Sequence, residues 1–211
     1  RIPGVYYREE DGYGNFPNIS IRGAEGTRSD NVTIMEDGIL TAPAAYSAPS
    51  AYYSPNAARM GGIEILKGSS QIAHGPHTTG GVINYLSTQF PTDHSFYLRS
   101  TYGSNSAFDI HSYWSDTSEG DFGRVGILAE IYYRQTDGYR KLDAGNGFGG
   151  SDETGFDLME PMVKIFWEPN SDVYQRWEFK YGYTEFDADE TYAGLTESDL
   201  KANPYRRYAG T

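Results

Sequence analysis

The chain contains no cysteine, which excludes disulfide bonds and is compatible with an exported protein. It also has no apolar run near the roughly 20 residues that a membrane-spanning helix needs, so any passage through a membrane would have to use strands. Basic residues are few: 17 Lys and Arg stand against 29 Asp and Glu, for a formal net charge of −12. Because a phosphate backbone binds a basic surface, no nucleic-acid partner is expected.

What the chain does have, beyond residue 91, is a regular alternation of polar and apolar residues. A period of two is typical of β-strands with one apolar face and one polar face. The pattern is clearest in residues 121–134, recurs in 108–115 and 176–184, and is weaker in 96–102 and 160–168. It predicts five strands, at about residues 95–103, 107–116, 122–135, 156–168 and 173–186.

The alternation is compatible with a transmembrane β-barrel and with a soluble β-sandwich whose aromatic residues fill a core. Two further observations favour the barrel. Aromatic residues stand near the strand ends, where a barrel has its interfacial rings: Tyr102, Trp114, Tyr133, Trp167 and Tyr183. The connections 117–121 and 169–172 are short, whereas 136–155 and the segment from 187 onward are long, which is the asymmetry of periplasmic turns and external loops; the short connection 104–106 departs from it.

The first 90 residues follow another pattern. Short apolar runs at 19–22, 32–35, 63–66 and 82–86 are separated by Gly, Pro, Ser and Asn, which predicts a small mixed domain of short strands. Residues 57–62 could form a short helical turn. We therefore expect two domains, residues 1–90 and residues 91–211.

Five motifs in the first domain occur in a specific order: RIPG at 1–4, NISIRG at 18–23, VTIMEDG at 32–38, IEILKGS at 63–69 and GPHTTGGVIN at 75–84. Together they resemble successive motifs of the plug domain of TonB-dependent outer-membrane receptors. Residues 187–208 (DADETYAGLTESDLKANPYRRY) resemble the third external loop of the ferric dicitrate receptor branch.

The resemblance implies a 22-stranded transmembrane β-barrel with an N-terminal mixed α/β plug domain, in the bacterial outer membrane. Most of the plug would lie in residues 1–90 and the first five barrel strands in 91–211. Five strands cannot close a barrel, and residues 1–4 show no export signal, so we expect a fragment or partial representation of a longer receptor. The implied partners are the TonB–ExbB–ExbD energising complex, a ferric chelate, and outer-membrane lipid with lipopolysaccharide. Iron would be carried only within the chelate, without a resident cofactor.

Ligand capture in this architecture uses plug apices and external loops, and ferric citrate complexes are anionic. Arginine, which matches carboxylates bidentately, and lysine are therefore the preferred candidates, with tyrosines as hydrogen-bonding walls. The candidate ligand-binding residues are Arg28, Tyr46, Tyr52, Tyr53, Arg140, Lys141, Arg206 and Arg207. Taken singly, each could instead be a solvated loop residue, and nearby acids such as Glu9, Asp152 and Asp187 oppose an anionic ligand unless the basic groups cluster.

The family resemblance implies that plug arginines pair with carboxylates of the inner barrel wall. We therefore expect a structural role for Arg22, in the IRG motif. By the alternation, Glu130, Glu160 and Glu178 face inward. Such pairs would hold the plug in place, because removal of one partner from a buried ion pair costs roughly 3–5 kcal/mol.

No motif indicates catalysis or a resident metal. His74 and His77 have no third ligand in their glycine-rich loop, residues 68–81 lack a phosphate-binding motif, and Asp187, Asp189 and Glu190 lack EF-hand spacing. We expect a transport receptor and not an enzyme. The alternatives are a structural or adhesive outer-membrane barrel and a soluble β-rich enzyme, and the ligand could also be another siderophore, a cobalamin or a sugar.

Overall fold

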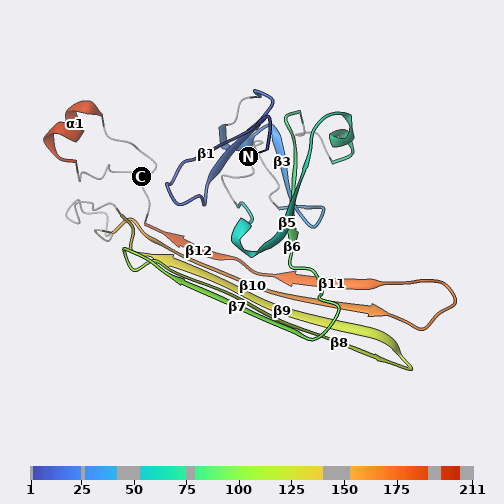
Figure 1. The fold of residues 1–211 in the computed structure, drawn as a ribbon. Coiled ribbons are helices and arrows are strands. Elements are labelled where there is room, and N and C mark those ends of the chain that lie inside the picture. The colour runs from blue at the N-terminus through green and yellow to red at the C-terminus, as the bar shows by residue number, and fades with distance from the viewer. Residues whose placement is uncertain are drawn as a thin grey trace. The chain divides into compact units, whose positions relative to one another are not determined.

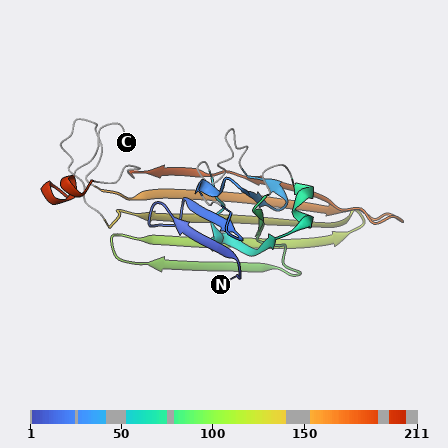
Figure 2. The same cartoon turned by 90° about the horizontal axis from the view of Figure 1, so that it is seen from above.

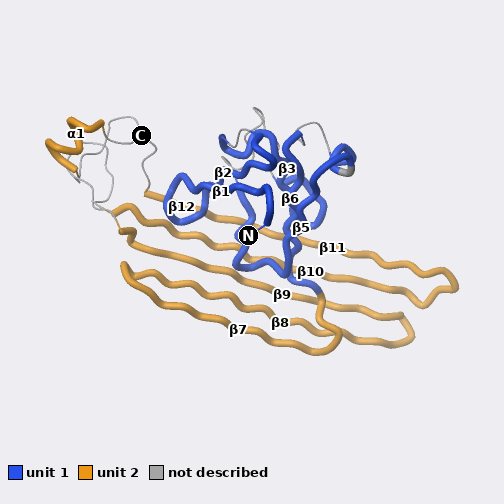
Figure 3. The backbone as a smooth tube through the Cα atoms, turned by 45° about the horizontal axis from the view of Figure 1, so that its top comes forward, with its two compact units in different colours: residues 1–89 blue, residues 90–211 orange. Residues whose placement is uncertain are grey.

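The computed structural model describes residues 2–24, 27–41, 53–74, 79–139, 153–189 and 196–204 (Figure 1). The chain divides into two compact units, Arg1–Gln89 and Phe90–Thr211 (Figure 3). No helix within the described ranges is both long enough and apolar enough to span a membrane.

The first unit contains a hairpin and a four-stranded sheet. The hairpin pairs β1 (Val5–Glu9) with β2 (Pro17–Ile21), and the sheet has the order β4-β3-β6-β5, with bounds Ile39–Leu40, Val32–Glu36, Gly81–Ser87 and Met60–Leu66. Strands β3 and β6 are parallel, so the sheet is mixed. Buried side chains of β2, β3 and β6 form the core: Ile19, Ile21, Val32, Ile34, Ile83 and Tyr85.

The sequence predicted four of these six strands and missed β1 and β4. Most side chains of these two strands are exposed, so no buried alternating face marks them. The helical turn expected at 57–62 is a 3-10 helix over Ala57–Arg59 only, and β5 begins at Met60. In the described part of this unit all helical segments are 3-10, the others being η1 (Thr27–Ser29) and η4 (Ser69–His74), so its described residues form no α-helix of the expected mixed α/β plug.

A buried ion pair ties the end of β3 to the segment before β5. Arg59 is only 5% exposed, and its Nη1 and Nη2 atoms donate to Glu36 Oε1 and Oε2 at 3.1 and 2.8 Å. Nη2 also donates to the Tyr53 hydroxyl at 2.8 Å. A bidentate, charge-assisted pair of this kind is specific in geometry, and its loss would leave a charge without its partner in a shielded site.

The second unit is an antiparallel sheet in the order β11-β10-β9-β8-β7, with β12 also paired to β10 (Figure 2). The bounds are Ser95–Tyr102 for β7, Phe108–Gly120 for β8, Gly123–Thr136 for β9, Phe156–Glu168 for β10, Trp177–Gly182 for β11 and Glu185–Ala188 for β12. Beyond it lies the short helix α1 (Glu197–Ala202), capped by Thr196.

The fifth strand differs from the prediction, because it begins at Trp177 instead of residue 173 and is interrupted. Strand β11 ends at Gly182, opposite Met162, and β12 begins at Glu185, opposite Met159. Between them the Tyr183 amide donates to the Pro161 carbonyl at 3.1 Å. Proline has no amide hydrogen with which to return that bond, so the ladder is interrupted there.

The β8–β9 turn is also tighter than predicted. Instead of a connection over 117–121, β8 continues to Gly120, which pairs with Gly123. Only residues 121–122 remain outside the ladder, which makes a two-residue hairpin.

The sheet of the second unit exposes an apolar face and buries a face that mixes charged side chains with apolar ones such as Leu128 and Met162. In β10, Ile165 and Trp167 are 40% and 45% exposed, whereas Glu160 and Lys164 are 2% exposed. Strand β9 follows the same rule, with Ile127 exposed and Glu130 buried. A sheet in water shows the opposite preference, so the exposed face is suited to hydrocarbon.

A glycine makes room for an aromatic ring on the buried face. Gly126 lies opposite Phe166, and a Cβ atom added at Gly126 would lie 2.1 Å from Phe166 Cε1. The Phe166 ring is almost completely buried, with the Arg124 and Arg176 guanidinium groups 5.4 and 4.0 Å from its centroid. A side chain at position 126 would therefore have to displace this packed ring.

The substitution Gly126→Ala is expected to lower the free energy of unfolding of the receptor by about 1–3 kcal/mol, the usual cost of overpacking. Gly182→Ala is the matched control, because the nearest atom to its new Cβ would be the Pro161 carbonyl oxygen at 3.9 Å. Urea denaturation in detergent measures both. Equal stability of the two variants would contradict this account of Phe166.

The substitution Arg59→Ala is expected to destabilise the first unit by roughly 3–5 kcal/mol, because it leaves Glu36 without the partner of a buried ion pair. Replacing both partners, as Glu36→Leu with Arg59→Met, is expected to cost much less. Denaturation followed by limited proteolysis of this unit compares the variants. A double variant as unstable as the single one would show that packing, not the orphaned charge, sets the cost.

Candidate functional site

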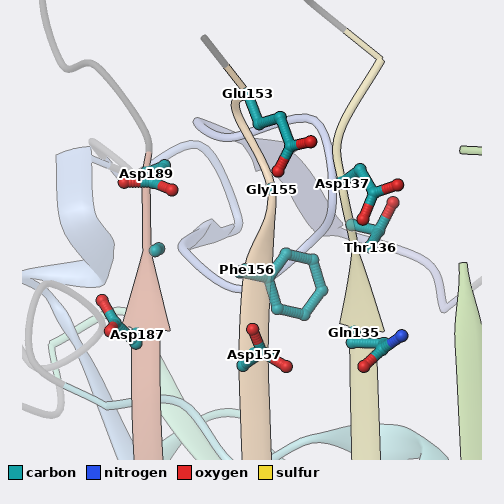
Figure 4. Close-up of a pocket in the computed structure, with 10 residues that line it drawn as sticks. Gln135, Thr136, Asp137, Glu153, Gly155, Phe156, Asp157, Asp187 and Asp189 are labelled. Carbon is teal, nitrogen blue, oxygen red and sulfur yellow. The ribbon is translucent and has the colours of Figure 1, made fainter. Parts of the chain in front are cut away.

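Three strand ends meet at the edge of the second unit that carries the long connections. The end of β9, the start of β10 and the end of β12 enclose a pocket of about 170 Å³ (Figure 4). Its lining residues are Gln135, Thr136, Asp137, Glu153, Gly155, Phe156, Asp157, Asp187, Ala188 and Asp189. Gly155 permits the close approach of the strands, because a Cβ there would lie 1.8 Å from the Thr136 carbonyl oxygen.

The pocket is acidic. Asp157 lies directly opposite Asp187, and such a like-charge pair is unfavourable unless counter-charges or water screen it. The Tyr133 hydroxyl lies 2.7 Å from Asp157 Oδ1 and donates to that carboxylate. Among the residues with described positions, no three His, Asp or Glu side chains are placed to hold a metal ion. In the sequence, Asp187 and Asp189 lack EF-hand spacing; the strand register places Asp157 opposite Asp187, and Asp189 lines the same pocket.

The pocket lies at the strand ends and is lined from both faces of the sheet, since Phe156 is buried and Asp157 is exposed. Asp157 is two residues from Met159, so both side chains lie on the exposed, apolar face of β10. The buried face carries Glu160 and Lys164 instead.

Among the basic candidates from the sequence, Arg28 is the one that lies within the described residues, and its backbone has an unusual conformation. It has φ of 49°, and the next residue, Ser29, has φ of 56°, so two consecutive non-glycine residues adopt the left-handed conformation. The buried Ser29 hydroxyl holds this turn, accepting from the Ile19 amide at 2.9 Å and donating to the Pro17 carbonyl at 3.0 Å. A strained turn that a buried hydroxyl maintains is a recurrent feature of functional sites.

The Arg28 side chain itself is 44% exposed, and Nε lies 3.9 Å from Glu10 Oε1. An ion pair at this distance and exposure is weak. The Arg28 backbone amide donates to the Asn18 side-chain oxygen, which anchors the residue from the neighbouring strand. The arrangement presents a guanidinium group on a well-held backbone, as binding of a carboxylate requires.

The loop between β1 and β2 is rigid and acidic. The buried Asp11 carboxylate accepts hydrogen bonds from the backbone amides of Tyr13, Gly14 and Asn15 at 3.2, 2.9 and 2.9 Å. Burial, and then the charges of Glu9 and Asp11, raise the pKa of the nearby Tyr7 hydroxyl. Tyr7 therefore keeps its hydroxyl proton to a higher pH than an ordinary tyrosine.

Of the predicted tyrosines, Tyr53 is the one that the structure describes. Its hydroxyl accepts the hydrogen bond from Arg59, so it belongs to a structural network; its contact with a ligand stays a prediction. The sequence did not indicate this network of Glu36, Tyr53 and Arg59, because the three residues are separated in the chain and share no motif. The remaining candidates lie outside the described residues: Tyr46, Tyr52, Arg140, Lys141, Arg206 and Arg207.

The predicted plug-to-wall pairs involve both units. Arg22 is exposed at the end of β2, with φ of 56°, and its amide donates to the Gly4 carbonyl at 2.8 Å. Glu130 and Glu160 are buried, and Glu130 Oε1 lies 3.5 Å from His111 Nε2. Glu178 is exposed and forms an ion pair with Arg176 at 3.2 Å in its own unit. Pairing of Arg22 with these glutamates stays a prediction.

Comparison with known proteins agrees with the two-part architecture. Residues 1–82 match the TonB-dependent Receptor Plug Domain family. The ferric citrate transporter FecA, in its unliganded form, has a TM-score of 0.72 at 21% identity, over 98% of this chain and 30% of that chain. The ferric yersiniabactin uptake receptor FyuA from Yersinia pestis has a TM-score of 0.63 at 20% identity, over 88% and 27%.

The copper transporter OprC shares the fold as well, with a TM-score of 0.56 at 21% identity, over 89% of this chain and 27% of that chain. The chain thus spans about 30% or less of the length of these receptors. Proteins named for iron chelates and for copper share this fold, so fold alone does not select the ligand. Residues 1–82 therefore carry a match to the plug domain of TonB-dependent receptors, and the fold of nearly the whole chain is similar to that of the ferric citrate transporter FecA.

Proposed function

We propose that the chain is part of a 22-stranded receptor that binds a ferric chelate and imports it into the periplasm with energy from the TonB–ExbB–ExbD complex. The observation that carries this proposal is the succession of a plug domain and an antiparallel wall whose apolar face is exposed. Outer-membrane lipid and lipopolysaccharide would surround that face. In the described part of the sheet, β7 and β11 each pair on one side only, and further strands would close the wall.

Ferric citrate is the first ligand to test. The fold of the ferric citrate transporter matches nearly the whole chain, and the basic loop candidates are of the type that binds carboxylates. Charge sets a condition on this choice, because the chain carries a formal net charge of −12 and the long-connection edge of the wall carries an acidic pocket. An anionic chelate therefore requires Arg28 and the loop residues Arg140, Lys141, Arg206 and Arg207 to gather at one point.

Uptake of radioactive iron supplied as ferric citrate, in cells with and without a working TonB complex, tests the function. The expected result is accumulation that depends on both the receptor and the TonB complex. Accumulation with another ferric siderophore only would change the ligand and keep the function. A receptor that reaches the outer membrane and takes up no ferric chelate would favour the structural or adhesive alternative.

The double variant Arg206→Ala with Arg207→Ala is expected to weaken ferric citrate binding by about a hundredfold or more, because charge-assisted bonds to a carboxylate contribute roughly 1.5–3 kcal/mol each. Lys201→Ala is the matched control from the same segment, since Lys201 is exposed and pairs with Glu197 at 2.6 Å. Equilibrium binding to the purified receptor measures both. Unchanged affinity in the double variant would remove these arginines from the site.

Arg28→Ala is expected to weaken ferric citrate binding by about tenfold. The conservative change Arg28→Lys keeps the charge and loses the bidentate geometry, so its affinity should lie between alanine and wild type. Binding assays with the receptor in detergent give the three affinities. If alanine and wild type bind equally, Arg28 is a solvated surface residue.

A further inference from the structure

A cluster of charges surrounds Arg176, just before β11, on the short-turn side of the sheet. Its Nη1 lies 2.8 Å from Glu168 Oε1, and its Nη2 lies 3.2 Å from Glu178 Oε2. The Tyr174 hydroxyl donates to the same Glu168 oxygen at 3.1 Å, and Arg124 lies 3.7 Å from the other one. The guanidinium group of Arg176 is thus held by carboxylates on two neighbouring strands.

Phe90, the first residue of the second unit, packs onto this cluster. Its ring meets the Phe166 ring edge to face, with the centroids 4.8 Å apart and an interplanar angle of 81°. The Arg176 guanidinium lies 4.0 Å from the centroid of Phe166 and 5.6 Å from that of Phe90. Aromatic pairing and cation–π attraction therefore fix Phe90 to the wall. We name Phe90, Phe166 and Arg176 the Phe90 clamp.

Just before Gln89, Ser87 and Thr88 are held to the first unit by hydrogen bonds. The Ser87 amide donates to Asp37 Oδ1 at 2.9 Å, and its hydroxyl donates to Asp37 Oδ2 at 2.5 Å. The Thr88 hydroxyl donates to the Arg59 carbonyl at 3.4 Å. Ser87 and Thr88 are both buried.

Gln89 alone separates these two anchors. It is exposed, lies beyond the end of β6 at Ser87, and its side chain donates to the Ser87 carbonyl at 2.8 Å. Since both neighbours are held by side-chain contacts, a change in the relation of the two units concentrates in the φ and ψ of this residue, the behaviour of a hinge.

We propose that Gln89 is the pivot of the plug and that the Phe90 clamp holds the wall side of this pivot while ligand is admitted. The proposal rests on the proposed import function, because it assigns the place where the plug turns. The clamp keeps the chain from Phe90 onward on the wall, so the rearrangement takes place on the N-terminal side of Phe90.

Hydrogen exchange of the complete receptor in outer-membrane vesicles tests the clamp without any ligand. Phe90→Ala and Arg176→Ala are expected to speed amide exchange in residues 90–94 by about tenfold, because local opening no longer breaks the clamp contacts. Phe122→Ala is the control, as this exposed side chain lies in the β8–β9 turn and makes no part of the clamp. Exchange that is unchanged in both clamp variants would overturn the clamp.

Substitution of Gln89 tests the pivot. Proline fixes φ near −65°, so Gln89→Pro is expected to reduce iron uptake about tenfold at unchanged chelate affinity. The control Gln89→Ala is expected to keep the wild-type uptake and the wild-type affinity. Uptake at the wild-type rate in Gln89→Pro would overturn the pivot, and so would a parallel loss of affinity, which would mean a damaged plug. If the wild type binds no ferric chelate, the import function fails while the exchange experiment still decides the clamp.

Discussion

The membrane wall proposed for this protein depends on backbone hydrogen bonding in a place without water. Strands β9 and β10 pair without interruption from Phe156 opposite Thr136 to Glu168 opposite Arg124, which satisfies the backbone polar groups between them. In hydrocarbon each unpaired group costs several kcal/mol, so this ladder is the condition for exposing Ile127, Ile165 and Trp167. The apolar side chains can then face lipid, because the backbone polar groups are hydrogen-bonded within the sheet and need no partner from the lipid.

One residue weakens the ladder on the other side of β10, where β11 and β12 pair. Pro161 accepts the Tyr183 amide and cannot donate in return, so the partner strand is divided into β11 and β12. A proline is tolerated at this position because the missing bond lies on one side of the strand only, while Pro161 remains in register with Ile131 of β9. The interruption is local, and the register on its two sides is the same.

Charges are used differently in the two units. In the first unit, Arg59 and Glu36 form a shielded bidentate pair that specifies where the chain before β5 meets β3. In the second, Arg176 is held between Glu168 and Glu178 and covers the rings of Phe90 and Phe166. The acidic residues at the opposite edge are arranged around a pocket at the strand ends. Net charge alone therefore says little about the charge that an imported ligand would meet.

Sequence by itself determined the five alternating segments of the wall, the alternation of faces within them and the resemblance to receptor plug motifs, because a period of two and an ordered set of motifs are both local properties. It also identified β2, β3, β5 and β6, whose apolar runs end in turn residues. It could not find the exposed hairpin strand β1, the interruption opposite Pro161 or the partner of Tyr53. Nor could it bring Asp157 beside Asp187, or Phe90 beneath Arg176. These features depend on strand register and on contacts between distant segments, which only the tertiary structure decides, because no local pattern records which residues will face each other.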